Sequence, residues 1–288
     1  MKRLLRRVAT VLLLALLAVA LKPVQAPIAA PLQLTAEPVQ LSEEDPDATT
    51  VGALAWRGGM ALNAGSPAFG GLSDLVLSAD GAEVTLVGDK GNWATLRLSY
   101  ASDGRLADAA GIRLDAYRDR DGRAVVVPGE KDGESLTRRD GTLLVGFEQR
   151  HRIWAYPDGL DGPARSFPAP AGLQDASSNQ GAEALQQLAD GRLLLIAEDR
   201  PEDADAYPAW LYDGDSWAPL SIAGGVDYRP TGLAQLPGGD LLLLPERPSE
   251  SAERIREGIA ADRVVVSDTC GRPFRHGQRG VAIGWAGM

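Results

Sequence analysis

The stretch EALQQLADGRLLLIAE, residues 183–198, contains the pattern that decides the fold. An acidic residue and a Leu are followed by the turn pair Asp190-Gly191, an apolar run from Leu193 to Ile196 and a second acid, Glu198. An Asp-Gly pair between two apolar runs is a strong signal for a β-hairpin. The segment therefore predicts two antiparallel strands flanked by acidic residues.

Three other segments repeat this pattern, namely SDLVLSADGAEVTLVGD (73–89), ESLTRRDGTLLVGFE (134–148) and TGLAQLPGGDLLLLPE (231–246). The turn glycines Gly81, Gly141, Gly191 and Gly239 lie 60, 50 and 48 residues apart. A period near 50 with several short strands in each unit indicates a β-propeller. A single sheet cannot bury both faces alone, so neighbouring sheets must stack around an axis. We therefore predict an all-β fold of the propeller class.

The first 26 residues carry the features of a targeting segment. A basic start is followed by a 14-residue, largely apolar run from Val8 to Leu21, which suits a signal peptide and is short for a membrane span of about 20 residues. Val24-Gln25-Ala26 resembles a cleavage site, but Pro27 follows it directly. We predict a signal peptide or an uncleaved anchor in residues 1–26. The protein is then periplasmic or secreted, or attached to the inner membrane by this segment.

The bulk composition excludes several kinds of partner. The formal net charge is −10 and the pI is about 4.8, so nucleic acid and anionic lipid are not expected as main partners. Membrane contact is expected only through an uncleaved N-terminal segment. The single Cys270 excludes an internal disulfide and a Cys-based zinc site. The oligomeric state is not indicated by the sequence.

The rest of the chain divides into three parts. Residues 27–50 are rich in Pro, Glu and Asp and predict a linker, and residues 51–247 carry the repeats. Within them, 51–63 has strand character and is expected to close the ring against the last sheet. The hairpin pattern stops after Leu244, and 248–288 has a different composition. This tail is either a variable, disordered extension or a segment whose reading frame was lost, because local consistency with the repeats ends there.

Five segments together resemble a known family, and they occur here in the same order: FGGLSDL (69–75), DKGNW (89–93), FEQRHRIW (147–154), NQGAEAL (179–185) and YRPTGL (228–233). This set resembles the phytase-like propeller family, whose members are called "esterase-like activity of phytase" proteins. The resemblance covers about residues 50–247. It implies a propeller that hydrolyses an ester or phosphoester.

The chain departs from the family pattern in two ways. Ser135 stands where the family tends to have Gly, and a further blade that members usually carry is absent. We therefore expect a propeller that is incomplete or open at its C-terminal end, with exposed strand edges.

Acidic residues at matching repeat positions predict a metal site. Equivalent positions of successive blades meet around one axis, so their carboxylates would converge and need a cation to offset their repulsion. Oxygen ligands in this arrangement suit Ca²⁺ better than Zn²⁺. The alternative is that these acids cap strand ends and are solvated or paired with arginines. The candidate ligands are Asp74, Asp89, Glu134, Glu148, Glu183 and Glu198.

Four basic residues are the candidates for catalysis. Arg150 or Arg229 would hold a phosphate, because a guanidinium matches its oxygens. Lys90 and His151 follow, with His151 as a general base, although it could equally be exposed or packed in a strand. The chain has no G-x-S-x-G motif and two histidines, which argues against serine-hydrolase chemistry.

These observations predict an exported phytase-like propeller that hydrolyses a small ester or phosphoester with metal assistance. Two alternatives stay open, because a propeller fold hosts both enzymes and binding proteins. One is a non-catalytic propeller that binds a ligand or a protein partner. The other is an inactive, truncated copy.

Overall fold

The computed structural model describes residues 32–42, 45–51, 54–200, 206–223, 229–236 and 238–246. In these ranges the regular structure is β-strand, apart from one short 3₁₀ helix, η1 (Ala171–Asp175), which confirms the prediction of an all-β fold. Among these residues no helix is long and apolar enough to cross a membrane. The predicted targeting segment 1–26 and the tail 248–288 lie outside the described residues.

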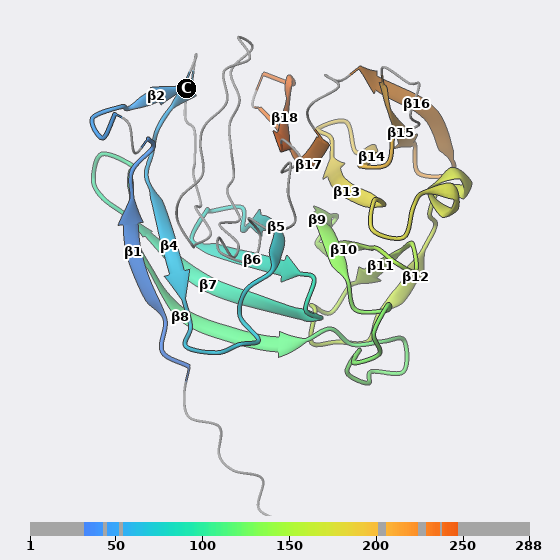
Figure 1. Ribbon diagram of the computed structural model, residues 1–288, viewed down its shortest axis with the longest axis horizontal. Helices are drawn as coiled ribbons and strands as arrows, with labels where there is room; N and C mark the ends of the chain where they lie inside the picture. Colours follow the sequence, from blue (N-terminus) through green and yellow to red (C-terminus); the bar gives the residue numbers. More distant parts are fainter. Residues whose placement is uncertain are drawn as a thin grey trace, which may run out of the picture. The chain divides into compact units, whose positions relative to one another are not determined.

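Three four-stranded antiparallel sheets follow one another along the chain (Figure 1). The first sheet contains β5 (Leu72–Leu77), β6 (Glu83–Gly88), β7 (Asn92–Tyr100) and β8 (Leu106–Ala116). The second contains β9 (Gly133–Arg139), β10 (Thr142–Phe147), β11 (Arg152–Tyr156) and β12 (Arg165–Phe167). The third contains β13 (Ala182–Gln187), β14 (Leu193–Ala197), β15 (Ala206–Tyr212) and β16 (Trp217–Ala223). A fourth, two-stranded sheet contains β17 (Arg229–Gln235) and β18 (Leu241–Glu246).

Each sheet begins with one copy of the repeat, and the strands of each sheet pair in chain order. The first strands are neighbours in space, with β5 beside β9, β9 beside β13 and β13 beside β17. This is the arrangement expected of propeller blades. The propeller prediction is thereby confirmed, while an open ring stays a prediction.

The N-terminal strands differ from the sequence prediction. Strand β1 (Thr35–Val39) lies inside the segment predicted as a linker, and it pairs with β4 (Gly59–Asn63). Two short strands, β2 (Thr50–Val51) and β3 (Leu54–Ala55), pair with each other. Segment 51–63 is not one strand, because residues 56–58 separate β3 from β4 and Gly58 has a φ of 102°, which favours glycine and does not fit a strand. In the described part of the chain β4 therefore pairs with β1 and not with the last sheet.

The hydrophobic core is divided into layers between successive sheets. Phe147 of the second sheet packs with Trp93 of the first, and Leu185 of the third sheet packs with Leu144 of the second. Side chains along each middle strand alternate between the two faces of the sheet, so one sheet contributes to the core layers on both of its sides. Each core layer between two blades is buried only when both of those blades are present.

Side chains also link the first strands of neighbouring sheets, each of which is paired with another strand on one side only. Asp74 Oδ2 accepts a hydrogen bond from the backbone N–H of Leu136 at 2.7 Å. Thr137 Oγ1 accepts one from the N–H of Gln187 at 3.0 Å, and Gln235 Oε1 accepts one from the N–H of Ala189 at 2.6 Å. These bonds satisfy edge N–H groups that would otherwise be costly to bury.

One buried hydroxyl gives a stability prediction. Ser135 is fully buried beside Gly146, and its Oγ has no hydrogen-bond partner among the described residues. Burial of an unsatisfied polar group costs about 1–3 kcal/mol. We expect Ser135→Ala to raise the free energy of unfolding by about 1 kcal/mol in urea titrations. Ser99→Ala, on the exposed side of β7, is the control and should change little; a loss of stability in Ser135→Ala would contradict the argument.

Candidate functional site

A β-bulge lies at the same place in every blade. In each first strand one residue is skipped in the register with the second strand: Ser73, Glu134, Glu183 and Thr231. A bulge leaves the extra residue unpaired and changes the direction of its side chain. The four skipped residues are structurally equivalent, and in the second and third blades they are acidic.

A second set of acids follows the second strands of the first three blades. Asp89, Glu148 and Glu198 come directly after β6, β10 and β14. Because each second strand is antiparallel to the first, its end lies beside the start of the first strand. The bulged acid and the strand-end acid of one blade therefore lie at the same end of the sheet.

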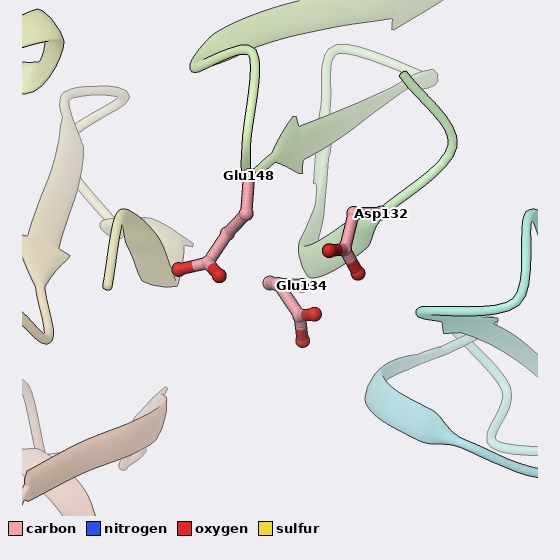
Figure 2. Close-up of side chains that lie close together, drawn as sticks. All are labelled: Asp132, Glu134 and Glu148. Carbon is pink, nitrogen blue, oxygen red and sulfur yellow. The ribbon is translucent and has the colours of Figure 1, made fainter. Parts of the chain in front are cut away.

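Three carboxylates of the second blade converge (Figure 2). Asp132 precedes β9, Glu134 is the bulged residue and Glu148 follows β10. One oxygen atom from each of the three side chains lies within 4.8 Å of the other two. Asp132 and Glu148 are buried, and Glu134 is partly buried.

Glu148 also belongs to a second group. Its carboxylate and those of Glu183 and Glu198, from the third blade, each place one oxygen within 4.8 Å of the others. The two groups share Glu148, so five acidic side chains form one continuous cluster between the second and third blades. We call it the carboxylate cluster: Asp132, Glu134, Glu148, Glu183 and Glu198.

Burial and mutual repulsion disfavour the charged form of this cluster. Burial raises the pKa of Glu134 to about 9, and the neighbouring Asp132 and Glu148 add to the effect. Burial raises the pKa of Glu148 to about 7, with a further contribution from Glu198. The pKa of Glu183 lies well above its usual value, first through burial and then through the charges of Glu134, Glu148 and Glu198. The cluster therefore holds protons near neutral pH unless a cation replaces them.

Gly181 allows the chain to pass between Glu148 and His151. Its backbone N–H donates a hydrogen bond to Glu148 Oε1. A Cβ atom at this position would lie 2.4 Å from His151 Nδ1 and 3.5 Å from Glu148 Oε1, so only glycine fits without a rearrangement. His151 Nε2 lies 3.1 Å from the carbonyl oxygen of Ser177, which favours a proton on Nε2. Nδ1 is then a buried acceptor without a partner among the described residues.

Two of the predicted metal ligands lie outside the carboxylate cluster. Asp74 follows the bulge of its blade, and its structural equivalents are Ser135, Ala184 and Gly232 rather than Glu134 and Glu183. Its oxygens accept the N–H groups of Leu75 and Leu136, and burial raises its pKa to about 7. Asp89 is exposed and lies against Gly71. The other four, Glu134, Glu148, Glu183 and Glu198, are brought together.

The predicted catalytic residues are not gathered in one place. Arg229 forms an ion pair with Glu198, with 2.9 Å between Nη1 and Oε1, and so lies at the edge of the cluster. Arg150 is exposed and pairs with Glu130, and Lys90 is exposed near Gly70. His151 is buried beside Gly181. Arg229 and His151 therefore lie beside the cluster. Arg150 is instead paired with Glu130, and Lys90 is exposed.

Asp132 is the one member of the cluster that the repeat pattern missed. It precedes the strand by one residue, and the repeat comparison begins at Glu134. A signal was present, because Asp132-Gly133-Glu134 places two acids around a glycine at the start of a blade.

The geometry of the cluster fits a hard divalent cation. Calcium binds 6–8 oxygens at about 2.3–2.6 Å, so ligands on opposite sides of the ion lie about 4.6–5.2 Å apart. In each group the three oxygens lie within 4.8 Å of one another, so one ion could reach all three. The donor set is entirely carboxylate, which excludes a thiolate-type site and suits Ca²⁺, Mg²⁺ or Mn²⁺.

Comparison with known proteins gives two results of different kinds. Proteins named coenzyme F420:L-glutamate ligase are among the relatives. The one from Halorubrum lacusprofundi is 40% identical over 175 residues, which is 61% of this chain and 64% of that protein. The one from Halobacterium salinarum is 60% identical over 70 residues, which is 24% of this chain and 26% of that protein. The chain thus spans less than two thirds of the length of these relatives.

These relatives contradict the function expected from the sequence. They are named as ligases, and the name gives coenzyme F420 and L-glutamate as what they act on. This overturns the prediction of an exported phytase-like hydrolase with a small ester or phosphoester as its substrate. The physical reason is that the prediction rested on a resemblance at the level of the fold, and a propeller scaffold does not set the chemistry of its sites.

A solved structure adds no functional argument. The exo-β-1,3-galactanase of Phanerochaete chrysosporium aligns at 10% identity with a TM-score of 0.39, over 74% of this chain and 60% of the galactanase. A likeness this remote supports no conclusion about the site.

The second result concerns the family. Residues 67–262 match the family described as "Phytase-like: Esterase-like activity of phytase". The match includes all three four-stranded sheets and the β17–β18 hairpin. The chain therefore belongs to the phytase-like family.

Proposed function

We propose that this propeller is a cation-binding protein and that the carboxylate cluster holds a divalent ion of the Ca²⁺ type. The observation that carries the proposal is the shared position of Glu148 in two three-carboxylate groups. Bulges in β9 and β13 place Glu134 in one of these groups and Glu183 in the other. Five carboxyl groups thus surround a small volume at one end of the first strands.

The electrostatics support this proposal. Among the described ion pairs the cluster has Arg229 as its cationic partner, on Glu198 alone. The remaining carboxylates must either keep protons or share a cation, because buried like charges repel each other in a medium of low dielectric constant. A divalent ion would replace those protons, and its affinity would therefore rise with pH.

Calcium should stabilise the folded protein through this cluster. At a Ca²⁺ concentration of about 100 times Kd the stabilisation is about 2.7 kcal/mol, or a rise in Tm of roughly 5–10 °C. Thermal unfolding with EDTA and with Ca²⁺ measures the effect, and calorimetry gives the stoichiometry. Glu134→Gln and Glu183→Gln should each remove most of the rise.

The matched control is Glu83→Gln, the same change at an exposed position of β6, which should keep the full Ca²⁺ response. An equal response in all three variants would place the ion elsewhere. No response in the unaltered protein to Ca²⁺, Mg²⁺ or Mn²⁺ would refute the proposal.

The cluster also sets a pH dependence in the absence of metal. The folded-state pKa values of about 9 for Glu134 and about 7 for Glu148 exceed the ordinary value for glutamate. The folded state therefore binds more protons than the unfolded state between about pH 4.5 and 9. Across this range the free energy of unfolding falls as the pH rises, because the protonated carboxyls that favour folding lose their protons. Urea unfolding in EDTA should show this fall, and Glu134→Gln should flatten it. Stability that is constant or rises from pH 5 to 9 would contradict the pKa assignment.

The relatives' name supplies a second candidate function, the joining of L-glutamate to coenzyme F420. The observation that favours it is the 40% identity over 175 residues with the Halorubrum lacusprofundi ligase. The test is to incubate the chain with coenzyme F420, L-glutamate, a nucleoside triphosphate and a divalent ion. A mass increase of one glutamyl residue on the coenzyme would establish the ligase, and unchanged coenzyme would leave cation binding as the function.

A further inference from the structure

A hollow lies on the first strands, farther along them than the carboxylate cluster. It has a volume of about 440 Å³ and is lined by residues of β5, β9, β13 and β17 and of the turn after β13. Small-molecule sites commonly have volumes of about 300–1,000 Å³. On β9, Arg138 of this hollow lies four residues beyond Glu134, or about 13 Å along an extended strand. The hollow is therefore distinct from the carboxylate cluster.

The charge of this hollow is opposite to that of the rest of the protein. Its lining contains one charged side chain, Arg138, and no acidic residue, although the chain has a formal net charge of −10. The other polar side chains are Thr137, Gln186, Gln187 and Gln235. Arg138 lies in β9 and is partly buried.

The guanidinium of Arg138 lacks the partner that a partly buried arginine normally has. Its Nε atom is buried without a hydrogen bond, and no ion pair of Arg138 occurs in the described part of the chain. The Nε of the next residue, Arg139, is also buried without a hydrogen bond, but Arg139 has other partners: its Nε lies 3.8 Å from Asp140 Oδ2 and its guanidinium 5.2 Å from the centre of the Tyr212 ring. A guanidinium offers five N–H donors in a fork that matches an oxyanion.

The amide side chains around Arg138 are partly held in place. Gln235 Oε1 accepts the N–H of Ala189, and Gln235 Nε2 donates to the carbonyl oxygen of Gly239 at 3.0 Å. The Gln186 amide donates to the carbonyl oxygen of Gln187 at 2.6 Å. The backbone N–H of Gln187 is held by Thr137. These bonds fix the walls of the hollow before a ligand arrives, which lowers the ordering cost of binding.

We propose that this hollow binds a small molecule through an oxyanion, a carboxylate or a phosphate group, that pairs with Arg138. Leu75, Leu136 and Leu233 supply the apolar part of the lining. The ligand is thus a small anionic compound with an apolar portion. Its site lies on the same inner strands as the carboxylate cluster but does not depend on a cation there.

The test follows the side-chain N–H signal of Arg138 by ¹⁵N NMR. The full chain, in EDTA, is titrated with citrate, L-glutamate and inorganic phosphate, each at constant ionic strength set with NaCl. The signal is assigned from its loss in Arg138→Lys. We expect a saturable shift with at least one anion, and the anion that binds tightest distinguishes a carboxylate from a phosphate.

Variants separate binding from an unspecific salt effect. Arg138→Gln should weaken the apparent affinity, followed through backbone amides of β9 and β13, about tenfold or more. Arg139→Gln, which changes the neighbouring guanidinium outside the lining, should bind as the unaltered protein does. A linear, unsaturated shift with every anion, or equal affinity in Arg138→Gln, would overturn the proposal. EDTA removes divalent ions throughout, so the result does not depend on whether the carboxylate cluster binds a cation.

Discussion

The one extra residue at the start of each first strand is the constraint on which the site depends. A regular strand alternates its side chains between two faces. The bulge takes Glu134 and Glu183 out of this alternation and brings them beside Glu148 and Glu198. Without the bulge these acids would face a neighbouring blade, where a carboxylate would cost far more to bury.

The first strands of the four sheets, which we call the inner strands, carry side chains of opposite charge at their two ends. The starts of β9 and β13 bear the carboxylate cluster, whose buried acids have raised pKa values. The later parts of β5, β9, β13 and β17 line a hollow whose charged residue is Arg138. Between the two, Asp74 and Thr137 join neighbouring blades through backbone N–H groups. One set of strands thus holds the blades together and separates two sites of opposite charge.

The sequence predicted the blades well because the Asp-Gly and Gly-Gly turns and apolar runs are local signals. It also predicted that the acids at the ends of the second strands are equivalent, and Glu148 and Glu198 do lie in the cluster. It grouped Asp74 with Glu134 and Glu183 because all three are acids near the start of a repeat, although Asp74 lies one residue later, at the position of Ser135 and Ala184. Asp132 was missed because it precedes the strand, and the pairing of β4 with β1 depends on long-range contacts. The hydrolase function failed for a different reason, since it rested on family resemblance and not on a site.

The central claim is that the carboxylate cluster holds a divalent cation. The most direct measurement is an anomalous difference map from crystals of the full chain grown with Ca²⁺. The account predicts a peak within about 2.3–2.6 Å of carboxylate oxygens of Glu148 and of the other members of at least one of the two groups, Asp132 and Glu134 or Glu183 and Glu198. A map with no peak there, or with its strongest peak away from these side chains, would contradict it.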